Sequence, residues 1–133
     1  MAQSTRDHYT ALTAQVAATL DTISFKRFEY NQQRTLWKVH GTWGKYNVRL
    51  KEVHSAKGRM YSFYVIDASS VVIGFDNYPD RQALYANYQE AFASHLDELI
   101  PHKHTANKET LELTEPMTVA TFLDYLRKEI PQT

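Results

Sequence analysis

Cysteine is absent from this chain of 133 residues, and only four glycines and four prolines occur in it. The lack of cysteine excludes disulfide bonds, thiolate nucleophiles and cysteine-ligated zinc. It also fits a reducing cytosol, so we expect a cytoplasmic protein. The few glycines are wrongly placed for a phosphate-binding loop, and neither a Ser-His-Asp order nor an H-E-x-x-H helix is present.

Long apolar runs and a net charge are lacking as well. No segment approaches the roughly 18 consecutive apolar residues of a membrane-spanning helix. The first residues lack the basic and then apolar pattern of a secretory signal, so we expect no membrane partner. Lys and Arg number 15, as do Asp and Glu, so the formal net charge is zero. The chain as a whole is therefore not a polycation that coats nucleic acid or anionic lipid.

What is present is an ordinary globular composition with many aromatic residues. Hydrophobic residues make up 43% of the chain and charged residues 23%, close to the average of folded domains. The length favours a single domain over residues 1–133. Aromatic residues reach 13%, including nine tyrosines.

The first half of the chain changes from a helical to a strand period. Apolar residues at Tyr9, Leu12, Val16 and Leu20 recur on one face of a helix expected over residues 5–20. From residue 23 to residue 76 the period is two, which predicts a meander of about four or five antiparallel strands. A slip in the alternation predicts a bulge between Phe25 and Phe28, and Gly41 to Gly44 are expected to interrupt a strand that begins at Leu36.

The second half predicts two more helices and a short strand. A helix is expected over residues 80–93, a strand over residues 109–114 and a last helix after Pro116. Residues 94–108 do not favour one conformation. The expected fold class is α+β, with an antiparallel meander sheet of about four to six strands flanked by an N-terminal, a central and a C-terminal helix.

Charge is unevenly distributed along the chain. Residues 22–60 have a balance of +7, from nine basic and two acidic residues, whereas residues 61–100 have a balance of −5. Arg49 and Lys51 are two residues apart in an expected strand, so they point to one face of the sheet.

The same basic stretch contains Trp37, Trp43 and Tyr46. A basic sheet face that also carries aromatic rings suits single-stranded RNA, since cations bind the phosphates and rings stack on the bases. The alternative is a solvated outer face on which lysines discourage edge-to-edge pairing.

The sharpest local feature is Pro101-His102-Lys103-His104. In an extended segment both imidazoles lie on one side, roughly 6 to 7 Å apart. Two imidazoles at this spacing can share a metal ion, or one can act as a base and the other as an acid. Lys103 would lie nearby and could hold a phosphate.

Asp76 and Asn77 follow an expected strand and can supply oxygen ligands or a carboxylate that orients a histidine. The alternative for this pair is a turn or a helix cap. His95, seven residues before His102, adds a third imidazole to the region.

Four segments of the sequence together resemble the TumE-like toxin family, a group of small prokaryotic proteins encoded beside a helix-turn-helix antitoxin. The segments are Tyr61-Ser-Phe-Tyr-Val-Ile-Asp67, Gly74-Phe-Asp-Asn-Tyr-Pro-Asp80, Pro101-His-Lys-His104 and Leu111-Glu-Leu-Thr-Glu-Pro116. The resemblance covers about residues 46–130, and the family pattern falls on Tyr61, Phe63, Asp76, Asn77, Pro101, His102 and His104. This sequence departs from the family by a helix-sized insertion at residues 80–95, before His95 and His102.

The resemblance implies a growth-inhibiting toxin that is neutralised by a cognate helix-turn-helix antitoxin protein. Together with the basic sheet and the histidine pair, it leads us to expect a ribonuclease or other phosphodiesterase that acts on RNA. His102, His104 and Asp76 are the candidate catalytic residues and also the candidate ligands of a divalent metal ion. The candidate substrate-binding residues are Lys103, Arg49, Lys51, Asn77 and Tyr61. The alternative is a non-catalytic protein that binds RNA or an antitoxin, and a homodimer is left open.

Overall fold

The computed structural model describes residues 2–132, and its centre is one antiparallel sheet in which seven strands follow each other in chain order. The strands are β1 (Thr22–Tyr30), β2 (Thr35–Trp43), β3 (Tyr46–Ser55), β4 (Gly58–Asp67), β5 (Ser70–Asp76), β6 (His102–Thr105) and β7 (Thr110–Leu113). The first five strands are joined by short turns. The connection from β5 to β6 is long and contains two short helices, and we call its residues 80–95 the helical lobe.

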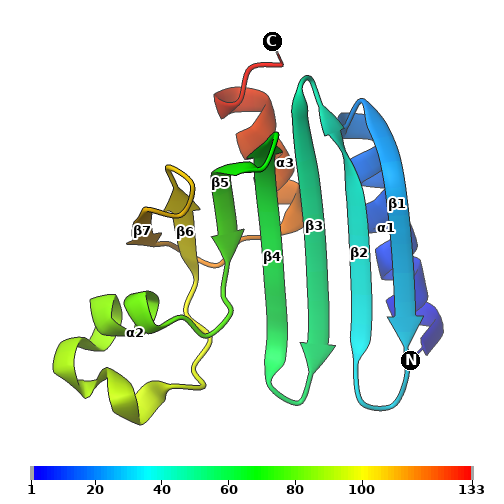
Figure 1. Ribbon diagram of the computed structural model, residues 1–133. Helices are drawn as coiled ribbons and strands as arrows, with labels where there is room; N and C mark the ends of the chain where they lie inside the picture. The colour runs from blue at the N-terminus through cyan, green and yellow to red at the C-terminus, as the bar shows by residue number, and fades with distance from the viewer. Residues whose placement is uncertain (1, 133) are drawn as a thin grey trace.

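Helices lie at both ends of the chain and in this connection. They are α1 (Ala2–Thr19), α2 (Arg81–Tyr88), the 3-10 helix η1 (Gln89–His95) and α3 (Val119–Glu129). Asp80 caps α2 by accepting hydrogen bonds from two backbone N–H groups, and the Thr118 side chain caps α3 in the same way. Figure 1 shows α1 and α3 behind the sheet, with α2 set apart near β5 and β6.

The expected α+β class, the antiparallel meander and the three flanking helices are confirmed, but the sheet has seven strands rather than four to six. The sequence did not resolve β6, because its buried positions are occupied by His102 and His104 rather than by apolar residues. The central helix is also shorter than expected, because η1 replaces its last turns.

Two details of the meander differ from expectation. Strand β2 continues through Gly41 to Trp43 instead of ending at His40, because Trp43 is buried in the core on the same face as Val39. The bulge in β1 lies between Ile23 and Phe25, before the expected position.

One face of the sheet is covered by α1 and α3. Its central cross-strand row is Val39, Leu50, Phe63 and Phe75, and all four side chains are buried. The ring of Phe122 in α3 contacts Phe63 and Phe75, with centroids 5.5 and 6.1 Å away. Side chains alternate along each strand, so the neighbouring residues of these strands point to the other, open face.

A second, smaller cluster joins the helical lobe to the end of the sheet. Ala83 and Leu84 of α2 pack with Ile100, and Leu111 of β7 lies against them. Leu111 pairs across strands with His104, so the lobe packs on the open-face side of β6 and β7. None of the helices within residues 2–132 is long and apolar enough to cross a membrane.

A buried carboxylate connects elements on the covered face. Glu52 of β3 is 4% exposed and accepts hydrogen bonds from the Tyr9 hydroxyl of α1 at 3.1 Å and from Arg59 of β4 at 2.7 Å. Arg59 also donates to the carbonyl of Met117, just before α3. These contacts therefore link both covering helices to the sheet.

We expect Glu52→Ala to lower the free energy of unfolding by about 3 kcal/mol, because it leaves Arg59 and the Tyr9 hydroxyl without their buried partner. Urea unfolding measures the loss. The matched control is Glu29→Ala, which removes a partly exposed carboxylate that pairs with Arg27 and Arg34 and should cost less than about 1 kcal/mol. Equal losses in the two variants would contradict this assignment.

Candidate functional site

The pairing of β5 with β6 brings the sequence-predicted acid and histidines together. Asp76, the last residue of β5, is the cross-strand partner of His102, and Gly74 is the partner of His104. Paired residues share a face of a sheet, so the carboxylate and both imidazoles lie on the open face. One ligand atom from each of the three residues lies within 4.8 Å of the other two, and all three residues are buried.

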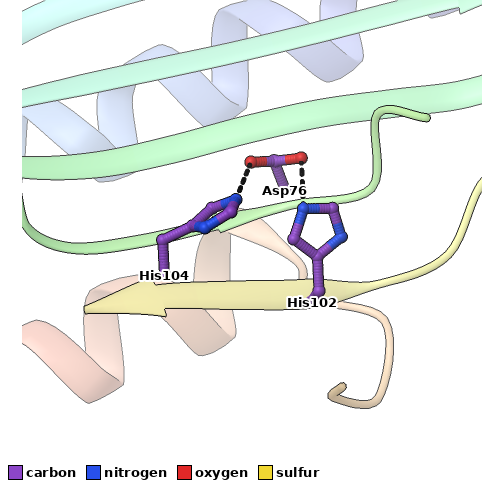
Figure 2. A group of neighbouring side chains, drawn as sticks. All are labelled: Asp76, His102 and His104. Carbon is purple, nitrogen blue, oxygen red and sulfur yellow. Dashed lines mark ion pairs between the residues drawn. The ribbon is translucent and has the colours of Figure 1, made fainter. Parts of the chain in front are cut away.

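Figure 2 shows the two imidazoles reaching the carboxylate of Asp76 from β6, one at each oxygen. His102 Nε2 lies 3.1 Å from Asp76 Oδ1, and His104 Nε2 lies 3.7 Å from Asp76 Oδ2. The ring centroids are 4.9 Å apart and the rings are perpendicular. This separation is shorter than the strand rise predicts, because both rings lean toward the shared carboxylate.

A backbone carbonyl fixes the orientation of the His102 ring. The Nδ1 atom of this ring lies 2.7 Å from the carbonyl oxygen of Ile100, and since a carbonyl only accepts, Nδ1 carries a proton. Nε2 then faces Asp76, but it is not aligned for a directed hydrogen bond. Within residues 2–132, His102 Nε2 and His104 Nδ1 are the buried side-chain nitrogen or oxygen atoms that lack a hydrogen-bond partner.

Asp76 is itself fixed by two donors. The hydroxyl of Tyr64 donates to Oδ2 at 2.6 Å, and the backbone N–H of Tyr78 donates to Oδ1 at 3.1 Å. Burial alone would raise the pKa of Asp76, but its contacts with His102 and Tyr64 lower the pKa below its usual value. The carboxylate is therefore ionised near neutral pH.

The pKa values of His102 and His104 are shifted in opposite directions. Burial lowers the pKa of His102, but Asp76 and the Ile100 carbonyl raise it, and the net shift is upward. For His104, burial and then the neighbouring His102 lower the pKa. Burial and the bond to Asp76 raise the pKa of Tyr64, so its hydroxyl remains a donor.

A pocket of about 310 Å³ opens in front of this group. Its lining residues are Lys51, Ser62, Tyr64, Asp76, Tyr78, Pro79, Asp80, His104 and Lys108. His102 is fully buried and does not line the pocket. The two histidines therefore cannot exchange protons directly with both sides of one phosphate, as the spacing of the sequence suggested. His104 lines the pocket, whereas His102 contacts Asp76 from the buried side of the carboxylate.

Two further candidates from the sequence lie away from the pocket. Lys103 is the cross-strand partner of Phe75, so it points to the opposite face, where it pairs with Glu112 at 3.3 Å. Tyr61 is fully buried on the covered face and accepts a hydrogen bond from the N–H of Met117. It therefore belongs to the core and cannot contact a substrate in this structure.

Asn77, Arg49 and His95 also have positions that the sequence did not specify. The Asn77 side chain is buried and bonds the backbone of Tyr61 and Arg59, which ties the end of β5 to β4. Arg49 lies on the open face but outside the pocket. The ring of His95 stacks on Tyr88, and its Nδ1 contacts Glu98, so it is engaged in the helical lobe.

Several pocket residues were missed by the sequence reasoning. Ser62 and Tyr64 face Asp76 because of the register between β4 and β5, and alternation along β4 was the signal that could have placed them. Lys108 follows Ala106 and Asn107 in a turn in which all three residues have positive φ. No local pattern in the sequence predicts that turn.

The open face of β1 to β4 carries a row of cations that leads to the site. Successive cross-strand partners are Arg27, Lys38, Lys51, Ser62, Asp76 and His102. Arg27 pairs with Glu29. Within the described part of the chain, Lys38 and Lys51 have no carboxylate partner. Like charges directly opposite each other destabilise a sheet by about 0.2–1 kcal/mol, so this row stores repulsion that an anion would relieve.

A second row runs beside it through Phe25, His40, Arg49, Tyr64, Gly74 and His104. Phe25 is 41% exposed and its ring lies 5.1 Å from that of His40. Burial, and then the charges of Arg49 and Lys38, lower the pKa of His40. Trp37 and Trp43 are buried on the covered face, so the aromatic groups near the cations are different from those that the sequence suggested.

A comparison of the chain with models of protein families, with curated proteins and with solved structures finds no match. The function of the chain is therefore inferred from the residues of the site and from the sequence motifs.

Gly74 determines where Tyr64 lies. A Cβ atom at Gly74 would be 2.1 Å from Cε2 of Tyr64, and its three nearest atoms all belong to that ring. We expect Gly74→Ala to displace the ring from Asp76 and to lower the free energy of unfolding by about 1–3 kcal/mol, as measured by urea unfolding.

A double-mutant cycle is the control for this prediction. In a Tyr64→Ala background the clash is gone, so Gly74→Ala should cost much less than it does in the natural chain. The same cost in both backgrounds would show that the Tyr64 ring is not what requires glycine at this position.

Proposed function

We propose that this protein is the toxin-like component of a prokaryotic toxin-antitoxin system, and that it binds RNA across the open face of the sheet and cleaves it in the pocket. The observation that carries this proposal is the row of Arg27, Lys38 and Lys51, which leads without interruption through Ser62 to Asp76. A polyanion bound along the row has a phosphate in the pocket.

The dimensions of the row suit a short single strand. Neighbouring strands lie about 4.8 Å apart, so the distance from Arg27 to Asp76 is about 19 Å. The second row offers the ring of Phe25, the imidazole of His40 and the guanidinium of Arg49 for stacking with bases. Cations in one row and stacking groups in the next are the combination by which sheets bind single-stranded nucleic acid.

The pocket offers the groups that phosphodiester cleavage needs. Lys51 and Lys108 line it, and ammonium groups stabilise the negative charge that develops on the phosphate oxygens. Asp76 and His104 are the reactive groups that reach the pocket. His102 and Tyr64 hold the carboxylate in place, so they are positioning residues.

The toxin role is supported by the resemblance to the TumE-like family. The strand that ends in Asp76 and Asn77 and the His102-Lys103-His104 segment carry this likeness. On this basis the partner of the protein is a cognate helix-turn-helix antitoxin.

The second candidate is a non-catalytic RNA-binding or antitoxin-binding protein. It is favoured by the complete burial of His102, whose two nitrogens face Ile100 and Asp76 rather than the pocket. In that case the buried group only fixes the edge of the sheet, and the cation row alone carries the function.

Expression of the protein should arrest bacterial growth and shorten cellular RNA, and His104→Ala should abolish both effects, because it removes the imidazole that reaches the pocket. Colony counts and RNA gels measure them. The matched control is His95→Ala, a histidine in the helical lobe, which should remain toxic. Circular dichroism verifies that both variants fold. If folded His104→Ala remains toxic, the pocket is not the catalytic site, and RNA binding without cleavage by the natural chain assigns the second candidate.

RNA binding should depend on the cation row. We expect Lys38→Ala with Lys51→Ala to weaken the binding of a single-stranded oligonucleotide and to reduce the slope of log K against log salt by about 0.7 for each phosphate contact that is lost. Fluorescence anisotropy at several salt concentrations measures both quantities.

Lys103→Ala is the matched control, since it removes the same charge from the opposite face. Equal effects of Lys103→Ala and of the single variant Lys38→Ala would show that the RNA does not bind along the row. If the cation row binds an acidic protein segment but no oligonucleotide, the partner of this face is a protein rather than RNA.

A further inference from the structure

We propose that Asp76, His102 and His104 bind one divalent transition-metal ion of the zinc class, with an open coordination position toward the pocket. Binding of the ion does not depend on the proposed action on RNA.

The donor set is the first argument. Two imidazoles and one carboxylate are the ligands of many catalytic zinc sites, which keep a further position for water or substrate. Imidazole nitrogen favours zinc and its neighbours in the first transition series, whereas magnesium and calcium require mostly oxygen ligands. Two buried histidines beside a single carboxylate, His102 and His104 beside Asp76, therefore select a transition metal.

The distances are close to those of a formed site. Zinc lies about 2.0–2.2 Å from nitrogen and oxygen ligands, so two ligands of a tetrahedral ion are roughly 3.4 Å apart. His102 Nε2 and Asp76 Oδ1 are 3.1 Å apart, and His104 Nε2 and Asp76 Oδ2 are 3.7 Å apart. All three ligand atoms lie within 4.8 Å of one another, so an ion would draw them closer together.

The groups behind the ligands are the second argument. A metal-binding histidine commonly donates its other N–H to a carbonyl or carboxylate, and a ligating carboxylate is itself hydrogen-bonded. His102 Nδ1 faces the Ile100 carbonyl, and Asp76 accepts from the Tyr64 hydroxyl and the Tyr78 N–H. These contacts occupy Nδ1 of His102 and one position on each Asp76 oxygen, and they leave His102 Nε2 as the ring nitrogen that can bind a metal.

The unpartnered nitrogen is the third and independent argument. His102 is fully buried, and its Nε2 lies 3.1 Å from Asp76 Oδ1 without forming a hydrogen bond of good geometry. A buried polar atom without a hydrogen-bond partner destabilises the folded chain. A metal ion between His102, His104 and Asp76 would give His102 Nε2 a bond, with His104 Nε2 as the second imidazole ligand.

The pocket side provides the open position. His104 and Asp76 line the pocket, and Asp80 Oδ2 lies 3.9 Å from His104 Nε2. Asp80 Oδ1 is occupied as the cap of α2, so its other oxygen remains available to a water on the ion. The role of the ion rests on the proposed function: it would activate a water for hydrolysis. The oxygen of that water joins the phosphorus, the bond from phosphorus to the leaving oxygen breaks, and the leaving oxygen takes one proton of the water.

The test is zinc binding to protein that has been freed of metal with EDTA and then dialysed. We expect isothermal titration calorimetry to give one Zn²⁺ per chain, a higher melting temperature in the presence of zinc, and a visible absorption band when Co²⁺ replaces Zn²⁺. His104→Gln should weaken zinc binding more than about 100-fold, and Tyr64→Phe, which removes only a supporting hydrogen bond, about 10- to 100-fold.

His95→Gln is the matched control, because His95 also lies beside a carboxylate, that of Glu98, but outside the group of three. It should bind zinc like the natural chain. His104→Gln is preferred to a change at His102 because its side chain borders the pocket. No zinc binding by the natural chain, or equal binding by folded His104→Gln, would overturn the proposal.

A failure of this proposal can be distinguished from a failure of the proposed function. Oligonucleotide binding along the cation row is measured in EDTA, so it does not require the ion. Zinc titration of Lys38→Ala, a change in the cation row outside the pocket, uses no RNA and should give the value of the natural chain. Zinc binding that is lost in this variant as well would contradict a site made of Asp76, His102 and His104.

Discussion

The register between β5 and β6 is the constraint on which the site depends. It pairs Asp76 with His102 and Gly74 with His104, and a slip of one residue would turn both imidazoles to the other face. In their place Lys103 would face the carboxylate. Burial of three titratable side chains is unfavourable for each of them alone, and here they contact one another. The backbone ladder and the polar contacts therefore specify the same register, which explains how a strand of four residues can hold a defined arrangement of side chains.

Alternation along the strands gives the sheet two distinct faces. Val39, Leu50 and Phe63 form one row on the covered face, and the residues beside them, Lys38, Lys51 and Ser62, form a row on the open face. The packing of α3 against the apolar row fixes the strands, and through them the positions of the cations. A rigid core on one side thus sets the spacing of the charged groups on the other.

Much of this could be predicted from the sequence, where one local period decides the outcome. The helical period of α1 and the alternation in β3 and β4 predict those elements, and the two-residue spacing of His102 and His104 predicts that the imidazoles share a face. The same rule places Lys103 on the opposite face, although its position in the chain suggested that it belongs to the site. Alternation along β4 places Tyr64 on the same face as Ser62, but its position beside Asp76 depends on the pairing of β4 with β5. Lys108 could not be assigned, because its position depends on a turn of three left-handed residues. Burial of Tyr61 and Asn77 likewise follows from tertiary packing, which no spacing reveals.

The long connection between β5 and β6 has a structural consequence for the site. Residues 80–95 form the helical lobe, and Ala83 and Leu84 of this lobe pack on Ile100. The carbonyl of Ile100 faces His102 Nδ1, so the residue on which the lobe packs is also the one that fixes which nitrogen of His102 carries the proton. At its other end the lobe begins with Asp80, whose second carboxylate oxygen lies 3.9 Å from His104 Nε2 at the pocket. The lobe therefore contacts the site from both of its ends, through the backbone next to His102 and through a carboxylate next to His104.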